Sequence, residues 1–228
     1  MTSALTPRPG TIVIFSDTWC AFAHVAVYRL HESRRRLRLE ERVTFDHRAF
    51  PMELLNGNPG SRPGSDSEVP SVGNREPAAG WQLWQDKDWL YPSSTLPALE
   101  AVQAAKAQSP KASEDLDLAL RRAFWAESRC ITNRAVILDV AHNVSGPDEK
   151  AIEDALEAGA ARATVASQTR DAASGLVVCS PHVFLPDGTD YANPGMHIDW
   201  EGDWGVGYPR ILEDDPTVYD DILERSVV

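Results

Sequence analysis

Residues 15–24 read Phe15-Ser16-Asp17-Thr18-Trp19-Cys20-Ala21-Phe22-Ala23-His24 and place a cysteine between a strand and a helix. Residues 11–15 before it are apolar and β-branched, as in a buried parallel strand, and a helix is expected from Cys20 to about residue 39. A thiol in the first turn of a helix faces unpaired backbone N–H groups and the positive end of the helix dipole. Because both effects lower a cysteine pKa, the sequence predicts a reactive thiolate at Cys20.

A second thiol is missing from this stretch. Ala23 stands three residues after Cys20, where another cysteine would complete a Cys-x-x-Cys pair. The remaining cysteines, Cys130 and Cys179, lie far from it in the sequence, and the total of three is odd, which argues against a disulfide framework. We interpret Cys130 and Cys179 as structural. The sequence therefore predicts sulfur chemistry at a single thiol.

The composition is typical of a globular protein, with 43% apolar and 25% charged residues among 228. No apolar run approaches the roughly 20 residues that span a bilayer, and residues 1–10 hold no hydrophobic signal segment, so we expect a cytoplasmic protein. The net charge of −12 disfavours binding to nucleic acid or to anionic membranes. The basic run Arg34-Arg35-Arg36 with Arg38 is interpreted as a solvated helix end that complements the helix dipole.

The first helix is expected to lead into a second strand, which starts at residues 43–45 and ends at Phe50-Pro51. A strand–helix–strand unit implies a right-handed crossover and parallel pairing. The turn before Cys20 then lies at the carboxyl end of the sheet, where open α/β folds place their functional sites.

The middle of the chain is predicted to be one long loop followed by helices. Residues 56–76 are rich in Gly, Pro, Ser and Asn, which indicates a loop that is mobile or covers the site. Trp81, Trp84 and Trp89 are expected to anchor its far end. Helices are expected over residues 97–107, from residue 113, over 133–142 and over 148–173.

Strand character returns over residues 176–185, followed by a turn at 186–190, another short strand and a closing helix that starts at Asp215-Pro216. Pro181 lies inside this apolar run. Because proline removes a ladder hydrogen bond, Ser180-Pro181 is placed just before the strand itself.

The acidic stretch that follows is predicted to hold no metal. Its candidate ligands lack a metal-binding spacing and indicate a solvated acidic loop; they are Asp187, Asp190, His197, Asp199 and Asp203. Residues 202–208 are aromatic and glycine-rich without a phosphate-binding pattern, and are interpreted as a packed surface loop.

Three segments of the helical region add to this pattern: Ser94-Thr95-Leu96-Pro97-Ala98-Leu99-Glu100-Ala101, Leu120-Arg121-Arg122-Ala123-Phe124-Trp125 and Leu138-Asp139-Val140-Ala141. Over roughly residues 11–227 the chain resembles the cytoplasmic DsbA-like oxidoreductases related to the 2-hydroxychromene-2-carboxylate isomerases. The resemblance implies an α/β thioredoxin-like fold with a large inserted helical subdomain. Residues 1–50 and 175–228 would form the thioredoxin-like domain, and residues 51–174 the helical insertion.

The resemblance also implies roles for single residues. Cys20 matches the nucleophilic cysteine of the family, and Ala23 stands at the position of the resolving cysteine. Ser180-Pro181 matches the residue and cis-proline that face the active thiol, where the backbone can pair with a bound thiol or peptide as a strand would. The change at Ala23 argues against the ordinary two-cysteine cycle.

Two neighbours of these residues complete the predicted substrate site. Trp19 precedes the thiol. His24 could stabilise the thiolate as an imidazolium or act as a base when neutral, and a purely structural histidine is the alternative. His182, beside Pro181, is a weaker candidate.

The leading hypothesis is a thiol–disulfide oxidoreductase that acts through Cys20 alone. It would bind no cofactor tightly, would use glutathione, mycothiol or another small thiol as co-substrate, and would act on a disulfide-containing substrate. No nucleic acid or membrane partner is expected, and a homodimer stays open. The alternatives are a thiol-dependent isomerase or kappa-class-like glutathione transferase, whose relatives typically carry serine at the Cys20 position, and a non-catalytic thioredoxin-fold binding module.

Overall fold

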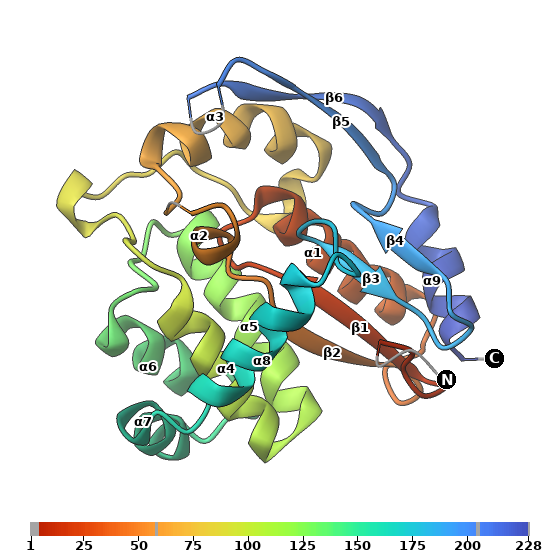
Figure 1. Cartoon of the computed structure of the whole chain (residues 1–228), viewed down its shortest axis with the longest axis horizontal. Coiled ribbons are helices and arrows are strands. Elements are labelled where there is room, and N and C mark those ends of the chain that lie inside the picture. Colours follow the sequence, from red (N-terminus) through yellow and green to blue (C-terminus); the bar gives the residue numbers. More distant parts are fainter. Residues whose placement is uncertain (1–4, 58, 204–205, 228) are drawn as a thin grey trace.

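The structure, a computed structural model, describes residues 5–57, 59–203 and 206–227. At its centre lies a four-stranded sheet in the order β2-β1-β3-β4 (Figure 1). The strands are β1 Thr11–Ser16, β2 Thr44–Ala49, β3 His182–Phe184 and β4 Asp190–Ala192. β1 and β2 pair in parallel, whereas β3 is antiparallel to β1 and to β4. The two strands of the predicted strand–helix–strand unit thus form the parallel β1–β2 pair of the sheet.

Both faces of the sheet are covered, which explains why residues 12–15 of β1 are all apolar. Ile12 and Ile14 pack on one face, against α1 (Ala21–Arg36) and α9 (Val218–Ser226). Val13 and Phe15 pack on the other face, in a cluster that includes Ala172. Alternate residues of a strand point to opposite faces, so a strand covered on both sides carries no polar face.

α1 ends at Arg36, three residues before the predicted end. Arg38 has a positive φ of 58°, a left-handed conformation that an α-helix does not continue through. Ala23, Val27 and Leu30 of α1 are fully buried.

The central part of the chain forms five helices: α4 Leu96–Gln108, α5 Pro110–Trp125, α6 Arg134–His142, α7 Glu149–Ala158 and α8 Arg162–Ala173. α5 starts earlier than predicted because the Ser109 side chain caps it, accepting a hydrogen bond from the backbone N–H of Ala112. The single helix predicted over residues 148–173 is two helices. Gly159 adopts a left-handed φ of 63° and ends α7 there.

The prediction of one long loop over residues 56–76 is wrong. This stretch contains α3, Arg62–Val72, which follows the short helix α2, Met52–Leu55, and precedes the single-turn helices Gly73–Arg75, Pro77–Ala79 and Asp88–Leu90. Ser61 caps α3 by accepting a hydrogen bond from Gly64 N, and Pro63 lies in its first turn. The cap and proline outweigh the loop-like composition. Of the tryptophans expected at its far end, Trp84 is buried and Trp89 is exposed.

A hairpin also forms where the sequence indicated loops. β5 (Met196–Glu201) and β6 (Tyr208–Asp214) pair antiparallel outside the main sheet and lie along α3 (Figure 1). His197 and Asp199 occupy the exposed face of β5. Residues 204–205 of the connection, part of the predicted surface loop, lie outside the described residues.

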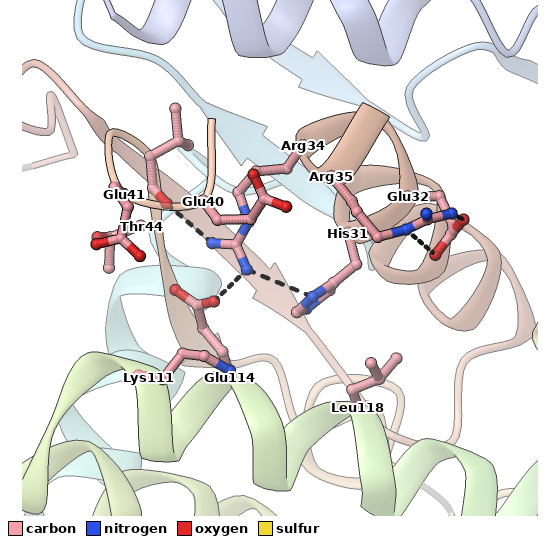
Figure 2. Close-up of a pocket in the computed structure, with 11 residues that line it drawn as sticks. His31, Glu32, Arg34, Arg35, Glu40, Glu41, Thr44, Lys111, Glu114 and Leu118 are labelled. Atoms are coloured by element: carbon pink, nitrogen blue, oxygen red, sulfur yellow. Dashed lines mark hydrogen bonds and ion pairs between the residues drawn. The ribbon is translucent and has the colours of Figure 1, made fainter. Parts of the chain in front are cut away.

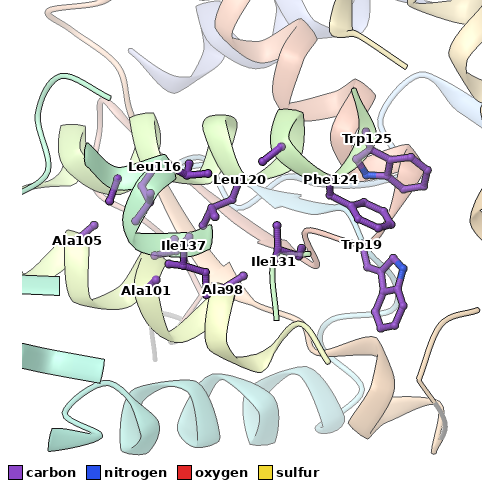
Figure 3. Close-up of a cluster of buried hydrophobic side chains, with 14 of the residues drawn as sticks. Trp19, Ala98, Ala101, Ala105, Leu116, Leu120, Phe124, Trp125, Ile131 and Ile137 are labelled. Carbon is purple, nitrogen blue, oxygen red and sulfur yellow. The ribbon is translucent and has the colours of Figure 1, made fainter. Parts of the chain in front are cut away.

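The largest apolar cluster joins the helices to the turn at Cys20 (Figure 3). Leu116 and Leu120 of α5 are fully buried against small residues of α4, such as Ala98 and Ala101. Each leucine contributes about 1.5–3 kcal/mol by burial. Trp19 belongs to the same cluster, so the packing that stabilises the helices also fixes the residue before the thiol. Among the described residues, none of the helices has the length and apolar character needed to cross a membrane.

An ion pair between Arg34 of α1 and Glu114 of α5 lies beside β2. It corrects the interpretation of residues 34–36 and 38 as a solvated helix end. Arg34 is buried, with its guanidinium 2.6 Å from Glu114 and 2.9 Å from the Val43 carbonyl oxygen (Figure 2). The other Glu114 oxygen accepts from Phe45 N at 2.8 Å. Only the rest of the run is solvated, because Arg34 lies on the side of α1 that faces α5.

Glu114→Ala is expected to lower the free energy of unfolding by about 3–5 kcal/mol, because it leaves a buried guanidinium and the Phe45 N–H without their acceptor. Urea denaturation measures the change. Glu157→Ala removes an exposed carboxylate paired with Arg134 and serves as the control, with an expected loss of less than about 1 kcal/mol. Equal losses in the two variants would contradict this account of the α5–sheet contact.

Candidate active site

The turn before Cys20 is organised by the buried carboxylate of Asp17. Its Oδ1 accepts from Trp19 N at 3.0 Å, and its Oδ2 accepts from Met52 N at 2.8 Å and from the Thr95 hydroxyl at 3.1 Å. Burial raises the pKa of this carboxyl, and the hydrogen bonds from Trp19 and Met52 oppose the rise. Asp17 thereby fixes the turn to α2 and to the start of α4.

Arg121 holds the same turn from α5. This fully buried guanidinium donates to the Asp17 carbonyl oxygen at 2.8 Å and to the Ser16 hydroxyl at 2.7 Å. Its remaining side pairs with Asp117 at 2.7 Å. The end of β1 is therefore hydrogen-bonded through both its side chains and its backbone.

Cys20 and the Ser180–Pro181 peptide meet across this turn. Cys20 is the N-cap residue of α1, and its Sγ lies 2.9 Å from the Ser180 carbonyl oxygen. The Ser180–Pro181 peptide bond is cis. The Ser180 hydroxyl accepts from Asp17 N at 3.0 Å, which anchors this loop to the turn. Ala23 is fully buried one turn along α1.

The prediction that Cys20 is a thiolate is wrong for the folded protein, in which Cys20 is buried. Burial raises the pKa of the thiol to about 12, and the Glu68 carboxylate acts in the same direction. The backbone N–H of Ala23 acts the other way, as a helix N-terminus should, but does not compensate for desolvation. A carbonyl oxygen accepts a hydrogen bond from a thiol and repels a thiolate, so the Ser180 contact also fits S–H.

Trp19 covers one side of the site. Its indole N–H donates to the Tyr91 hydroxyl at 2.6 Å, and its ring meets that of Phe124 edge-on, with centroids 6.4 Å apart (Figure 3). Gly60 lies directly on the indole, since a Cβ there would be 2.7 Å from Cε2. The segment before α3 can approach Trp19 this closely because residue 60 has no side chain.

His24 lies in an aromatic cluster, which favours the neutral ring among the alternatives that the sequence left open. Its ring contacts those of Trp81 and Trp125, with centroids 4.7 and 6.2 Å away. Burial lowers its pKa to about 3, so the ring is neutral. Nε2 is 3.2 Å from the Gly80 carbonyl oxygen and therefore carries the hydrogen. His24 thus binds the segment after α3 to α1.

The weaker candidates have structural contacts. His182 is buried, with Nε2 2.8 Å from Asp190, and its Nδ1 accepts from Val178 N at 3.2 Å. Cys179 lies near the site, with Sγ 3.2 Å from the Pro181 carbonyl oxygen, and burial raises its pKa to about 11. Cys130 is half-buried in the helical region, and all three cysteines are free. In the described part of the chain, no group of three or more His, Cys, Asp or Glu side chains could hold a metal ion.

The sequence did not indicate Glu68 or Trp200. Both line a cavity of about 30 Å³ beside Trp19. Burial raises the pKa of the Glu68 carboxyl to about 8. No local signal marks either residue, because Glu68 lies on α3, in a stretch of loop-like composition, and Trp200 reaches the cavity through the β5–β6 hairpin that packs on α3.

The family model described as a DSBA-like thioredoxin domain matches residues 11–197. No sequence among curated proteins gives a significant match.

Solved structures share the fold. A probable DsbA oxidoreductase from Streptomyces coelicolor superposes with a TM-score of 0.64 at 18% identity, covering 95% of this chain and 89% of that one. The cytosolic disulfide reductase DsbM from Pseudomonas aeruginosa gives 0.52 at 16%, covering 94% and 97%. A 2-hydroxychromene-2-carboxylate isomerase gives 0.55 at 18%, covering 79% and 87%. Identities this low show the thioredoxin-like α/β fold and nothing finer.

Alkylation of Cys20 by iodoacetamide is expected to accelerate about tenfold per pH unit from pH 7 to pH 10, because the thiolate fraction grows in proportion to hydroxide below the thiol pKa. Mass spectrometry of the labelled peptide follows the rate in the folded protein, and urea-unfolded protein is the control, with a plateau near the ordinary cysteine pKa of about 8.5. A plateau below pH 8 in the folded protein would show that the helix N-terminus prevails over burial.

Proposed function

Since the chain belongs to the family of DSBA-like thioredoxin domains, we propose that it is a thiol–disulfide oxidoreductase that acts through one cysteine, Cys20. The observation that carries the proposal is the contact of 2.9 Å between Cys20 Sγ and the Ser180 carbonyl oxygen at the cis-proline. Ala23, one turn along α1, offers no second sulfur. The two other cysteines are free and one of them, Cys130, lies in the helical region.

The reaction divides into two exchanges. Cys20 sulfur attacks the small-thiol sulfur of a mixed disulfide, the substrate S–S bond breaks, and the proton of the Cys20 thiol passes to the departing substrate sulfur. A second molecule of the small thiol then attacks the adduct on Cys20, which regenerates the Cys20 thiol and releases the small-thiol disulfide. One free small thiol is consumed, the substrate leaves as a thiol, and the S–S bond ends in the small-thiol disulfide, so atoms and electrons balance.

The protonation of Cys20 favours reduction over oxidation of substrates. Oxidants of this fold stabilise the reduced thiolate and so lose their disulfide readily. Burial does the opposite to Cys20, because it raises the thiol pKa to about 12 and makes Cys20 a poor leaving group. A mixed disulfide on Cys20 should therefore persist until a small thiol removes it. The thiol must reach the substrate during an opening of the residues that bury it.

Glutathione or a related small thiol is the proposed co-substrate. A protein of the same fold, the cytosolic disulfide reductase DsbM, has been solved with GSH. The same comparison supports the proposal that this chain works in the cytoplasm, where small thiols keep cysteines reduced.

A non-catalytic thioredoxin-fold binding module is the second candidate. It is favoured by the burial of Cys20, whose side chain is 5% exposed, together with Ala23. A binding module would form no adduct with any disulfide, which separates the two functions experimentally.

Incubation with glutathione disulfide is expected to add one glutathione to the protein at Cys20, and the adduct should remain until free glutathione is supplied. Intact-protein and peptide mass spectrometry measure both steps. Cys20→Ser should form no adduct, and Cys130→Ser should behave like the parent. An adduct that clears without added thiol would instead identify Cys179 as a resolving cysteine.

Ala23→Cys is expected to convert the protein into a dithiol oxidant, because residues i and i+3 share one face of a helix. Oxidation should lower the mass of the variant by two hydrogens, and disulfide exchange should then proceed without added thiol. The buried position costs about 1–3 kcal/mol of stability. A correctly folded variant that forms no internal disulfide would contradict the geometry assigned to the turn.

A further inference from the structure

A small cavity lies beside Trp19, between the start of α2, α3 and β5. Its volume is about 30 Å³, and its walls include Trp19, Met52, Gly60, Gly64 and Trp200. Glu68 of α3 supplies the one carboxylate among its lining residues. The indole of Trp19, which forms one wall, belongs to the residue adjacent to Cys20 in the chain.

Glu68 has no partner among the described residues. No hydrogen bond or ion pair reaches its carboxyl, and burial alone raises its pKa to about 8. The neighbouring charges are paired elsewhere: Asp66 with Arg62 on α3, and Glu201 with Arg210 on the hairpin. Glu68 is half-buried, so its carboxyl lines the cavity and is open to a cationic ligand.

We propose that this cavity binds a primary ammonium group carried by the thiol or disulfide that reacts with Cys20. The proposal rests on the function proposed above. The cavity has room for a group of at least the size of a water molecule, so an NH₃⁺ group can enter it. Indole faces attract cations, and the ammonium would give Glu68 a charged hydrogen-bond donor. A trimethylammonium group carries the same charge but has no N–H to donate to Glu68.

The position of Glu68 connects this site to the thiol. Its negative charge raises the pKa of Cys20 and that of Tyr91, so the carboxylate is close enough to act on both. A bound ammonium would favour the ionised form of Glu68 and cancel its charge, so that no uncompensated negative charge acts on Cys20. The same ligand group therefore orients the disulfide without making Cys20 harder to ionise.

Two disulfides of equal charge test the proposal: cystamine, with primary ammonium groups, and bis(2-trimethylammonioethyl) disulfide. The chemistry at Cys20 is the same for both. Cys20 sulfur bonds to one sulfur of the reagent, the S–S bond breaks, and the Cys20 proton leaves with the aminothiol. Mass spectrometry gives the rate of adduct formation in the native protein, in Glu68→Gln and in the matched control Glu224→Gln, an exposed carboxylate on α9.

The native protein and Glu224→Gln are expected to react faster with cystamine than with the trimethylammonium disulfide. The ratio of these two rates should fall about tenfold in Glu68→Gln. Because the ratio of two rates is compared within one protein, changes in the Cys20 pKa or in net charge cancel. Bis(2-hydroxyethyl) disulfide, which is neutral, checks that Glu68→Gln still folds and reacts.

An equal preference in the native protein and in Glu68→Gln would overturn the ammonium site and leave the oxidoreductase function standing. If none of the three disulfides modifies Cys20 in the native protein, the proposed function fails first, and the ammonium site fails with it.

Discussion

Most of this structure depends on one buried carboxylate. Asp17 accepts hydrogen bonds from the backbone of Trp19 and Met52 and from the Thr95 side chain, while its own backbone bonds to Ser180 and Arg121. Its neighbours come from segments that are distant in sequence: the first turn of α1, α2, the start of α4, α5 and the cis-proline loop. A buried carboxylate needs this many donors to offset its lost hydration. The same bonds that satisfy Asp17 therefore bring the helical region and the sheet together at the thiol.

The protonation state of Cys20 follows from this packing. An N-cap position stabilises a thiolate only where the sulfur stays partly hydrated, since the dipole effect contributes about 0.3–2 kcal/mol. Here Cys20 is buried, and the Glu68 carboxylate, when ionised, also acts against the thiolate. Burial thus outweighs the dipole. A reactive group that is protected at rest suits a protein that waits for a substrate to displace these neighbours.

The sequence alone predicts those parts of the fold and the site whose signal is local. The apolar run of β1, the helix after Cys20 and the proline of the Ser180–Pro181 peptide are all visible in the residues themselves, and the family match over residues 11–197 agrees with the predicted fold. It was insufficient where tertiary contacts decide. Arg34 is buried because Glu114, 80 residues away, meets it. Glu68 and Trp200 share a cavity only because the β5–β6 hairpin lies along α3. The pKa of Cys20 depends on the same long-range burial, which no local pattern reports.

The central claim is that burial makes Cys20 a thiol that keeps a bound small thiol instead of expelling it. The equilibrium constant for exchange between Cys20 and glutathione disulfide tests this most directly, measured by mass spectrometry over a series of glutathione to glutathione-disulfide ratios. A poor leaving group gives a constant of about one or larger, so that the adduct forms at modest ratios of the disulfide. A constant of about 0.01 or below would contradict the account, since it would require a reduced state stabilised as thiolate.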